Sequence, residues 1–155
     1  VHLGKLAVYL RLLGFDTLHN NHLDDPAIAA YAKNENRIVL TRDVALLKNG
    51  AISRCRWIRS RMPREQLAET IRYFELRPFL RPFTRCTVCN GAVAEVSKEI
   101  VRDLLKPETN RYYHDFYRCS SCGKVYWKGS HYPRLMELIE QAEHISTEPP
   151  ETGPH

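Results

Sequence analysis

The chain has 155 residues, enough for one domain or two small ones, and 43% of them are hydrophobic, which is enough for a packed core. No apolar run approaches the roughly 20 residues of a membrane-spanning helix and no secretory leader opens the sequence, so we expect a cytoplasmic protein. Residues 1–82 hold 14 Lys and Arg against 8 Asp and Glu, whereas residues 83–155 hold 9 against 10. A basic first half attracts polyanions such as nucleic acid, although a solvated basic surface explains the charge equally well.

The first half of the chain alternates helices with short strands. Leucines at helical spacing predict a helix over 3–13, and Phe15–His19 is a strand candidate. Asp24-Asp25-Pro26 has the form of a helix start and predicts a helix over 26–34. The remaining predicted elements are a buried strand at 37–41, a helical turn at 44–48, a strand at 56–59 and a helix at 64–76 opened by Pro63. This alternation predicts an α/β fold with a mostly parallel sheet and flanking helices.

Composition divides the chain near residue 82. Pro78 and Pro82 interrupt the helical and strand patterns and indicate a linker. We therefore expect a first domain at 1–82 and a second, cysteine-containing domain at 83–143. Residues 144–155 are rich in proline and poor in apolar residues, which predicts a disordered tail.

Four cysteines form two C-x-x-C pairs, Cys86 with Cys89 and Cys119 with Cys122, and 29 residues separate the pairs. A two-residue gap lets two thiolates converge on one ion, so two pairs predict a closed, structural Cys₄ zinc site of the zinc-ribbon type. Two disulfides, a redox C-x-x-C or an iron–sulfur cluster are the alternatives. The isolated Cys55 is expected to be a buried free thiol.

Three aspartates are candidate ligands for a second metal. Asp43 follows the strand at 37–41, at the carboxyl end where α/β sheets bind ligands, and Asp24 and Asp25 begin the helix that leads into this strand. If their carboxylates converge, they form an oxygen-rich site suited to catalytic Mg²⁺ or Mn²⁺. The alternative is that Asp25 and Asp43 each cap a helix.

Arginines are concentrated between residues 54 and 64. Arginine forks suit phosphate groups, so Arg56, Arg59 and Arg61 are candidate RNA contacts, with a solvated basic face as the alternative.

Taken together, these segments resemble the PIN-like ribonuclease domain named after the C-terminal domain of the Mutator-seven exonuclease. The resemblance extends to about residue 140 and rests on the order and spacing of several short motifs. In the first half these are Leu3–Ala7, Leu10–Thr17, Leu23–Asp25 and Arg37–Asp43, and in the second half Arg85–Gly91, Cys119–Trp127 and Gly129–His131.

The resemblance implies a PIN-like α/β fold, a C-terminal zinc ribbon and a metal-dependent ribonuclease with RNA as its partner. The family's acidic positions fall on Asp25, with Asp24 beside it, and on Asp43. The resemblance further suggests Lys5 and Arg42 as phosphate contacts near the catalytic site. At the exit of the ribbon it suggests His131 and Arg134 as RNA contacts, with an ordinary surface histidine as the alternative for His131.

One feature of that family is not found in this sequence. The family's first acidic residue lies on a strand just before the Leu-Gly-Lys-Leu-Ala helix, which here begins at Leu3. We expect the natural protein to continue upstream, in some relatives with a ubiquitin-like module. The expected function is a ribonuclease that cleaves endonucleolytically. The alternative function is a non-catalytic RNA- or ribosome-binding module.

Overall fold

The computed structural model describes residues 3–129 and 131–145. Its helices are α1 (Gly4–Leu12), α2 (Asp25–Asn34), α3 (Val44–Leu47), α4 (Pro63–Tyr73), α5 (Lys98–Val101), α6 (Pro107–Tyr112) and α7 (His131–Ile145), with 3₁₀ turns η1 (Arg77–Phe79) and η2 (Arg102–Leu104). Its strands are β1 (Val39–Thr41), β2 (Cys55–Trp57), β3 (Val93–Val96), β4 (Phe116–Cys119) and β5 (Val125–Tyr126). None of the described helices is long and apolar enough to cross a membrane.

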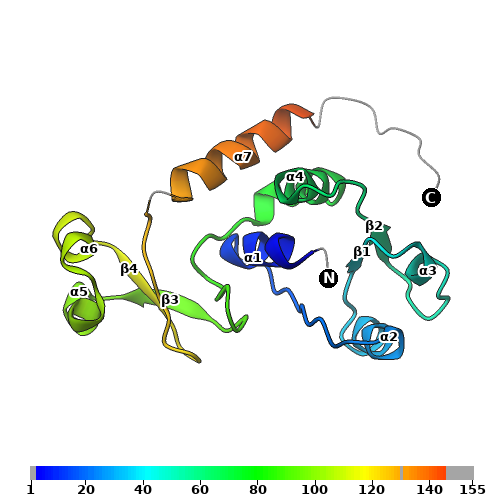
Figure 1. Ribbon diagram of the computed structural model, residues 1–155, viewed down its shortest axis with the longest axis horizontal. Helices are drawn as coiled ribbons and strands as arrows, with labels where there is room; N and C mark the ends of the chain where they lie inside the picture. The colour runs from blue at the N-terminus through cyan, green and yellow to red at the C-terminus, as the bar shows by residue number, and fades with distance from the viewer. Residues whose placement is uncertain (1–2, 130, 146–155) are drawn as a thin grey trace.

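The strands form two small sheets at opposite ends of the molecule (Figure 1). In the first half, β1 pairs in parallel with β2, so that Val39 lies opposite Cys55 and Thr41 opposite Trp57. In the second half, β3, β4 and β5 form an antiparallel sheet in that order. The structure thus confirms the predicted α/β fold with a parallel sheet and flanking helices, followed by a compact cysteine-bearing unit.

The main apolar core joins α1, α4 and α7. Leucines at helical spacing on α1, among them Leu6 and Leu10, are buried against Leu67 and Ile71 of α4. From α7, which lies across α4 in Figure 1, Leu135 and Ile139 enter the same cluster. Full burial of each such side chain stabilises the fold by about 1.5–3 kcal/mol. The helix that follows the cysteines therefore helps to hold the first half together.

The predicted tail begins inside α7, because this helix continues to Ile145. The remainder of that prediction, residues 146–155, lies outside the described residues.

The prediction of a strand at Phe15–His19 was wrong. The segment pairs with no other strand of the described chain, because side chains bind its backbone groups instead. The Thr17 N–H donates to Asn90 Oδ1 at 3.0 Å, and the Thr17 carbonyl accepts from Arg11 Nε at 2.9 Å. Phe15 packs against the main core, but the segment has no partner strand in the described chain.

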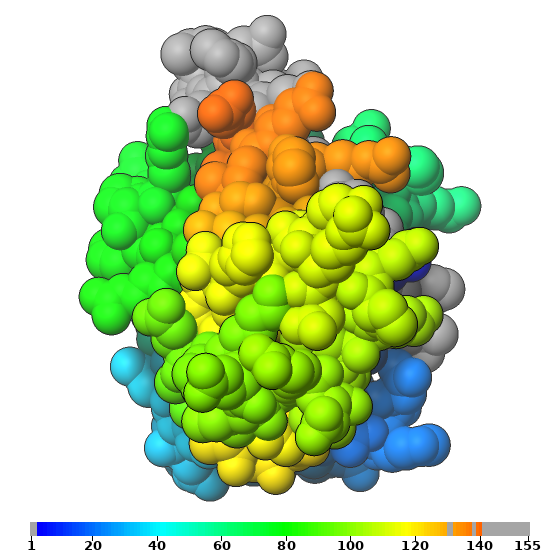
Figure 2. Space-filling model, turned by 90° about the vertical axis from the view of Figure 1, so that its left-hand side faces the viewer, coloured from blue at the N-terminus to red at the C-terminus, as the bar shows by residue number. Residues whose placement is uncertain are grey.

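Figure 2 shows the end of the molecule formed by the second half. The segment between the two cysteine pairs, coloured from yellow-green to yellow, makes up most of this face, and α7 lies above it in orange. A separate small core supports the face. It consists of Phe83, Cys86, Val93, Cys119 and Tyr126.

Candidate metal centre and cavity

Each cysteine pair lies in a turn with the same backbone hydrogen bonds. The Cys86 N–H donates to the Gly91 carbonyl and the Asn90 N–H donates to the Cys86 carbonyl, at 2.8 and 3.0 Å. In the second turn the Cys119 N–H donates to the Lys124 carbonyl and the Gly123 N–H donates to the Cys119 carbonyl, at 2.9 and 3.0 Å. Equal spacing in the sequence thus produces two equivalent turns that face each other.

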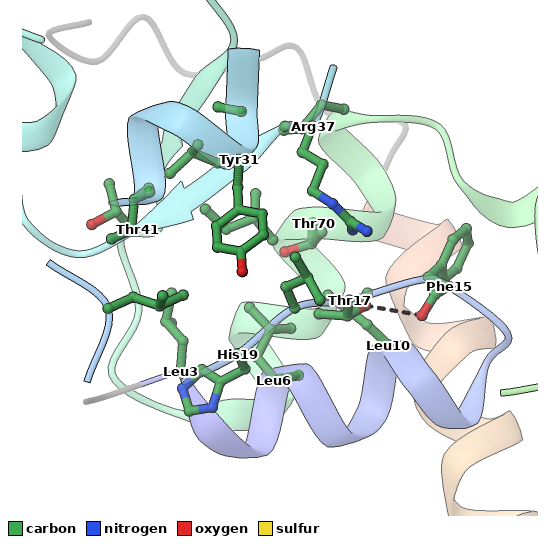
Figure 3. Close-up of a pocket in the computed structure, with 18 of the residues that line it drawn as sticks. Leu3, Leu6, Leu10, Phe15, Thr17, His19, Tyr31, Arg37, Thr41 and Thr70 are labelled. Carbon is green, nitrogen blue, oxygen red and sulfur yellow. Dashed lines mark hydrogen bonds between the residues drawn. The ribbon is translucent and has the colours of Figure 1, made fainter. Parts of the chain in front are cut away.

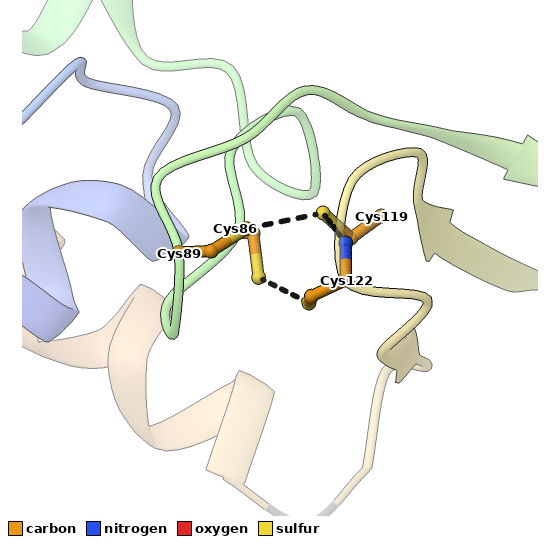
Figure 4. Close-up of side chains that lie close together, drawn as sticks. All are labelled: Cys86, Cys89, Cys119 and Cys122. Atoms are coloured by element: carbon orange, nitrogen blue, oxygen red, sulfur yellow. Dashed lines mark hydrogen bonds between the residues drawn. The ribbon is translucent and has the colours of Figure 1, made fainter.

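The four sulfurs meet at one point between the turns (Figure 4). All four lie within 4.8 Å of one another, with Cys86 Sγ 3.6 Å from Cys122 Sγ and Cys89 Sγ 3.4 Å from Cys119 Sγ. A tetrahedral zinc ion with Zn–S bonds of about 2.3 Å requires sulfurs about 3.8 Å apart. The cysteine cluster therefore fits a structural metal ion such as zinc, and its four protein ligands leave no position open for a reactive water.

Tyr126 is an outer partner of this cluster. Its hydroxyl lies 3.1 Å from Cys86 Sγ and accepts a hydrogen bond from the Thr87 N–H at 2.9 Å. Burial alone would raise the pKa of Cys86, but hydrogen bonds from the Tyr126 hydroxyl and from backbone N–H groups lower it to about 6. Burial and this contact raise the pKa of Tyr126 to about 12. The hydroxyl thus stays protonated and stabilises the thiolate that metal binding needs.

Each cysteine turn contains a glycine that a larger residue could not replace without a steric clash or backbone strain. A Cβ on Gly91 would lie 3.1 Å from both Cys89 Sγ and Cys119 Sγ. Gly123 has φ +81°, in the left-handed region that favours glycine. In the first turn, Asn90 takes the corresponding left-handed conformation with φ +65°.

A cavity of about 710 Å³ lies in the first half between α1, α2 and β1 (Figure 3). The apolar side of α1 forms one wall, and β1 and Tyr31 of α2 form the opposite wall. Polar side chains, among them Asp16, Arg37 and Asp43, complete its lining. Asp43 therefore faces a space large enough for a substrate group.

The three predicted acidic residues occupy different positions relative to this cavity. Asp43 lines it just beyond the carboxyl end of β1, and its Oδ1 accepts from the Ala45 N–H at 2.9 Å, which caps α3. Asp24 caps α2 by accepting from the Ala27 N–H at 2.9 Å, so the capping residue of this helix is Asp24 and not Asp25. Asp25 is exposed in the first turn. Apart from the four cysteines, no three acidic, histidine or cysteine side chains cluster among the described residues.

Several predicted RNA contacts have partners within the fold. Arg42 donates through Nη1 to the carbonyls of residues 58, 59 and 60, at 2.6, 2.6 and 3.1 Å. Arg56 lies 3.5 Å from Glu69 in an ion pair, and its guanidinium stacks 3.8 Å from the centre of the Tyr73 ring. Arg59 is half-buried, and its backbone N–H donates to Glu69 at 3.1 Å. Arg42 thus joins the end of β1 to the segment after β2, and Arg56 and Arg59 connect β2 and that segment with α4.

The remaining predicted RNA contacts are Lys5, Arg61, Arg134 and His131. The side chains of Lys5, Arg61 and Arg134 are exposed. His131 begins α7, but its side chain lies outside the described part of the chain.

A polar network between the first cysteine turn and the first half was not predicted from the sequence. Asn90 Nδ2 donates to Asp16 Oδ1 at 2.7 Å, and Arg37 pairs with the same carboxylate at 3.0 and 3.2 Å. Partial burial would raise the pKa of Asp16, but these hydrogen bonds outweigh burial and hold the pKa below its usual value. The residues are 74 and 21 positions apart, so no local motif joins them.

Comparisons with known proteins place the chain in one family. No curated protein and no solved structure matches it. The model of the Mut7-C RNAse domain matches residues 1–139, nearly the whole described chain. Because this match covers both the cavity and the four cysteines, the chain belongs to the Mut7-C RNAse domain family.

Proposed function

We propose that the chain is a PIN-like ribonuclease that cleaves RNA phosphodiesters endonucleolytically with the help of Mg²⁺ or Mn²⁺. Membership of a ribonuclease family supports the class of reaction. The observation that carries the proposal at the level of residues is the position of Asp43, beyond the carboxyl end of β1 and in the lining of the cavity. Ligand sites of α/β sheets lie at such strand ends.

The carboxylates of the first half suit a hard cation. Capping uses Oδ1 of Asp43, which leaves Oδ2 for another partner. Asp25 is exposed and Asp24 keeps its second oxygen. Carboxylate oxygens, waters and a substrate phosphate complete the shell of Mg²⁺ in proteins that cleave phosphodiesters. A bound ion of this kind lowers the pKa of water and offsets charge on the phosphate.

RNA is proposed to bind through exposed cations of the first half and of α7. Lys5 and Arg61 are accessible to a phosphate, as is Arg134 on α7. Arg42, Arg56 and Arg59 would act on RNA indirectly, by holding β2 and the loop that follows it in place. In the ribbon, zinc at the four cysteines serves the fold, because the closed sulfur shell leaves no site for substrate.

A cleavage assay on zinc-loaded protein tests this function. Labelled single-stranded RNA is incubated with Mn²⁺, with Mg²⁺ or without added divalent ion, and a circular RNA identifies endonucleolytic cuts. We expect cleavage that depends on added metal and that falls by on the order of 100-fold in Asp43→Asn, since even an outer-shell partner of a metal contributes 10- to 100-fold. Asp103→Asn, an exposed carboxylate of η2, is the matched control.

The alternative is a non-catalytic RNA-binding module. Asp24 and Asp43 both cap helices, and no group of three carboxylates clusters among the described residues, which favours this second function. Salt-sensitive RNA binding without cleavage in any divalent ion would establish it and contradict the nuclease. Cleavage that is unchanged in Asp43→Asn would remove Asp43 from the mechanism.

A further inference from the structure

The first cysteine turn is attached to the wall of the cavity by direct hydrogen bonds. Asn90, which follows Cys89, donates to Asp16 Oδ1 at 2.7 Å and accepts from the Thr17 N–H at 3.0 Å. Asp16 and Thr17 both line the cavity. One side chain therefore connects a metal-binding turn with two residues of the cavity wall.

A second connection runs through Arg11 of α1. Its Nε donates to the Thr17 carbonyl at 2.9 Å, and its Nη1 donates to the Thr87 carbonyl, inside the cysteine turn, at 3.1 Å. Thr17 thus has its N–H and its carbonyl bound by residues that also belong to the turn or contact it. No β-ladder holds this segment in the described chain. The Phe15 N–H donates to the Leu10 carbonyl at 2.9 Å, and at Thr17 the side chains of Asn90 and Arg11 hold the backbone.

The orientation of Asn90 depends on the shape of the turn. Asn90 has a left-handed backbone with φ +65°, and its N–H is bound to the Cys86 carbonyl. A metal ion held by Cys86 and Cys89 would fix the backbone between them, and metal sites of this kind are seldom formed without the ion. Loss of the ion would release Asn90 from the position in which it reaches both Asp16 and Thr17.

We propose that occupancy of the cysteine site controls the order of the cavity wall at residues 15–19, with Asn90 as the positioning residue. Metal binding and the ordering of residues 15–19 are then thermodynamically coupled. Because such coupling is reciprocal, a change that weakens the ordered wall also weakens metal binding. Removal of the Asp16 carboxylate weakens metal binding although Asp16 is not a ligand. This inference goes beyond the proposed nuclease activity and stands whether or not the chain cleaves RNA.

Hydrogen exchange at the Thr17 amide tests the coupling. We expect Thr17 to be protected in metal-loaded protein and to exchange at least about 10-fold faster in Asn90→Gly that still holds one zinc, because two hydrogen bonds are lost. Glycine retains the left-handed backbone, so the turn remains folded. Protection of the Cys86 amide, which is bound to the Gly91 carbonyl, verifies this in the same experiment.

Asn36→Gly is the matched control. Asn36 also has a left-handed backbone, with φ +55°, but its side chain accepts from Arg54 and does not contact the cysteine turn. We expect Thr17 in this variant to exchange as in the wild type. If Thr17 stays protected in zinc-loaded Asn90→Gly, or in wild-type protein after metal removal, the proposal is wrong.

Zinc affinity supplies the reciprocal test. Competition with a chromophoric chelator should show weaker binding in Asp16→Ala by about 5-fold or more, the lower range of measured couplings. Asp103→Ala, in the segment between the cysteine pairs, should bind zinc as the wild type does. Equal affinity in Asp16→Ala and wild type would contradict the coupling even if the cavity wall proved mobile.

Discussion

Asp43 makes a local hydrogen bond that decides which substitutions can test its charge. Asp43 accepts from the Ala45 N–H and so stabilises the start of α3. An asparagine side chain caps helices as well as aspartate does, whereas alanine cannot. The choice of substitution therefore separates the charge of Asp43 from its capping hydrogen bond.

We predict that Asp43→Asn leaves the free energy of unfolding within about 0.5 kcal/mol of the wild type, and that Asp43→Ala lowers it by about 1 kcal/mol. Urea unfolding followed by circular dichroism measures both. A loss of stability in Asp43→Asn as large as in Asp43→Ala would mean that the charge itself supports the fold.

The Asp16 carboxylate should make stability depend on pH in acid. Its pKa is lowered in the folded protein by hydrogen bonds from Asn90 and Arg37, against the effect of burial. A lowered pKa contributes stability above the unfolded value of 3.8, and this stability is lost as pH falls through the folded pKa.

We predict that the stability difference between wild type and Asp16→Asn is about 0.5–1 kcal/mol near pH 6, because the side chain is 46% exposed and solvent screens the pair. The difference should shrink below pH 4. Unfolding at several pH values measures it, with Asp103→Asn as the control. Because zinc leaves protonated cysteines in acid, the variants are compared at each pH with the same measured zinc content. A difference that stays constant down to pH 2 would assign the effect to packing.

The cysteines illustrate which parts of the site a sequence can predict. Their spacing is local, so two C-x-x-C pairs were sufficient to predict the convergence of the four sulfurs. Tyr126 and Asn90 escaped prediction because their partners, Cys86 and Asp16, are 40 and 74 residues away. No spacing rule describes such contacts.

We predict that Cys119→Ser lowers zinc below about half an ion per chain and unfolds residues 83–126, because the small core around Phe83 is insufficient without the metal. Elemental analysis and tryptophan fluorescence are the measurements. Cys55→Ser is the control, since Cys55 lies on β2 outside the cluster. Full zinc content in Cys119→Ser would exclude the four-sulfur site.

At the scale of elements, the sequence predicted the helices of the first half and both strands of the parallel sheet, but not the extended segment after α1 and not α5, α6 and α7. The helices were recognised because their apolar residues recur with the helical period and because proline and aspartate mark the starts of α2 and α4. The strand at Phe15–His19 was wrong because a short segment of sequence does not reveal whether a partner strand exists. The packing of α7 on α4 was not predicted either, because it depends on contacts between residues far apart in the sequence.

The contact of α7 with the first half can be tested by a single truncation. We predict that Leu135→Ala lowers the free energy of unfolding of the first half by about 2–4 kcal/mol, because Leu135 is buried in the core that α7 shares with α1 and α4. Glu137→Ala, exposed on the same helix, should change it by less than about 0.5 kcal/mol. A small effect of Leu135→Ala would mean that α7 is held mainly by the cysteine unit.

At the scale of the whole molecule, charge is distributed unevenly between the halves. Residues 1–82 carry a net charge of +6 and residues 83–155 a net charge of −1. Several cationic side chains of the first half already bind groups of the protein. Arg42 donates to backbone carbonyls, and Arg56 contacts Glu69 and Tyr73. Those that remain exposed, among them Lys5 and Arg61, are the ones available to a polyanion.

We predict that replacing the exposed residues Lys5, Arg61 and Arg64 together with alanine weakens RNA binding and makes it less sensitive to salt. Each phosphate contact to a single strand contributes about 0.7 to the slope of log affinity against log salt, so losing three lowers the slope by about 2. Fluorescence anisotropy between low and physiological salt measures it. The matched control replaces three exposed cations of the second half, Arg102, Lys106 and Arg111, and should leave the slope unchanged. If both triple variants reduced the slope equally, binding would follow overall charge, and the first half would not be the RNA-binding surface.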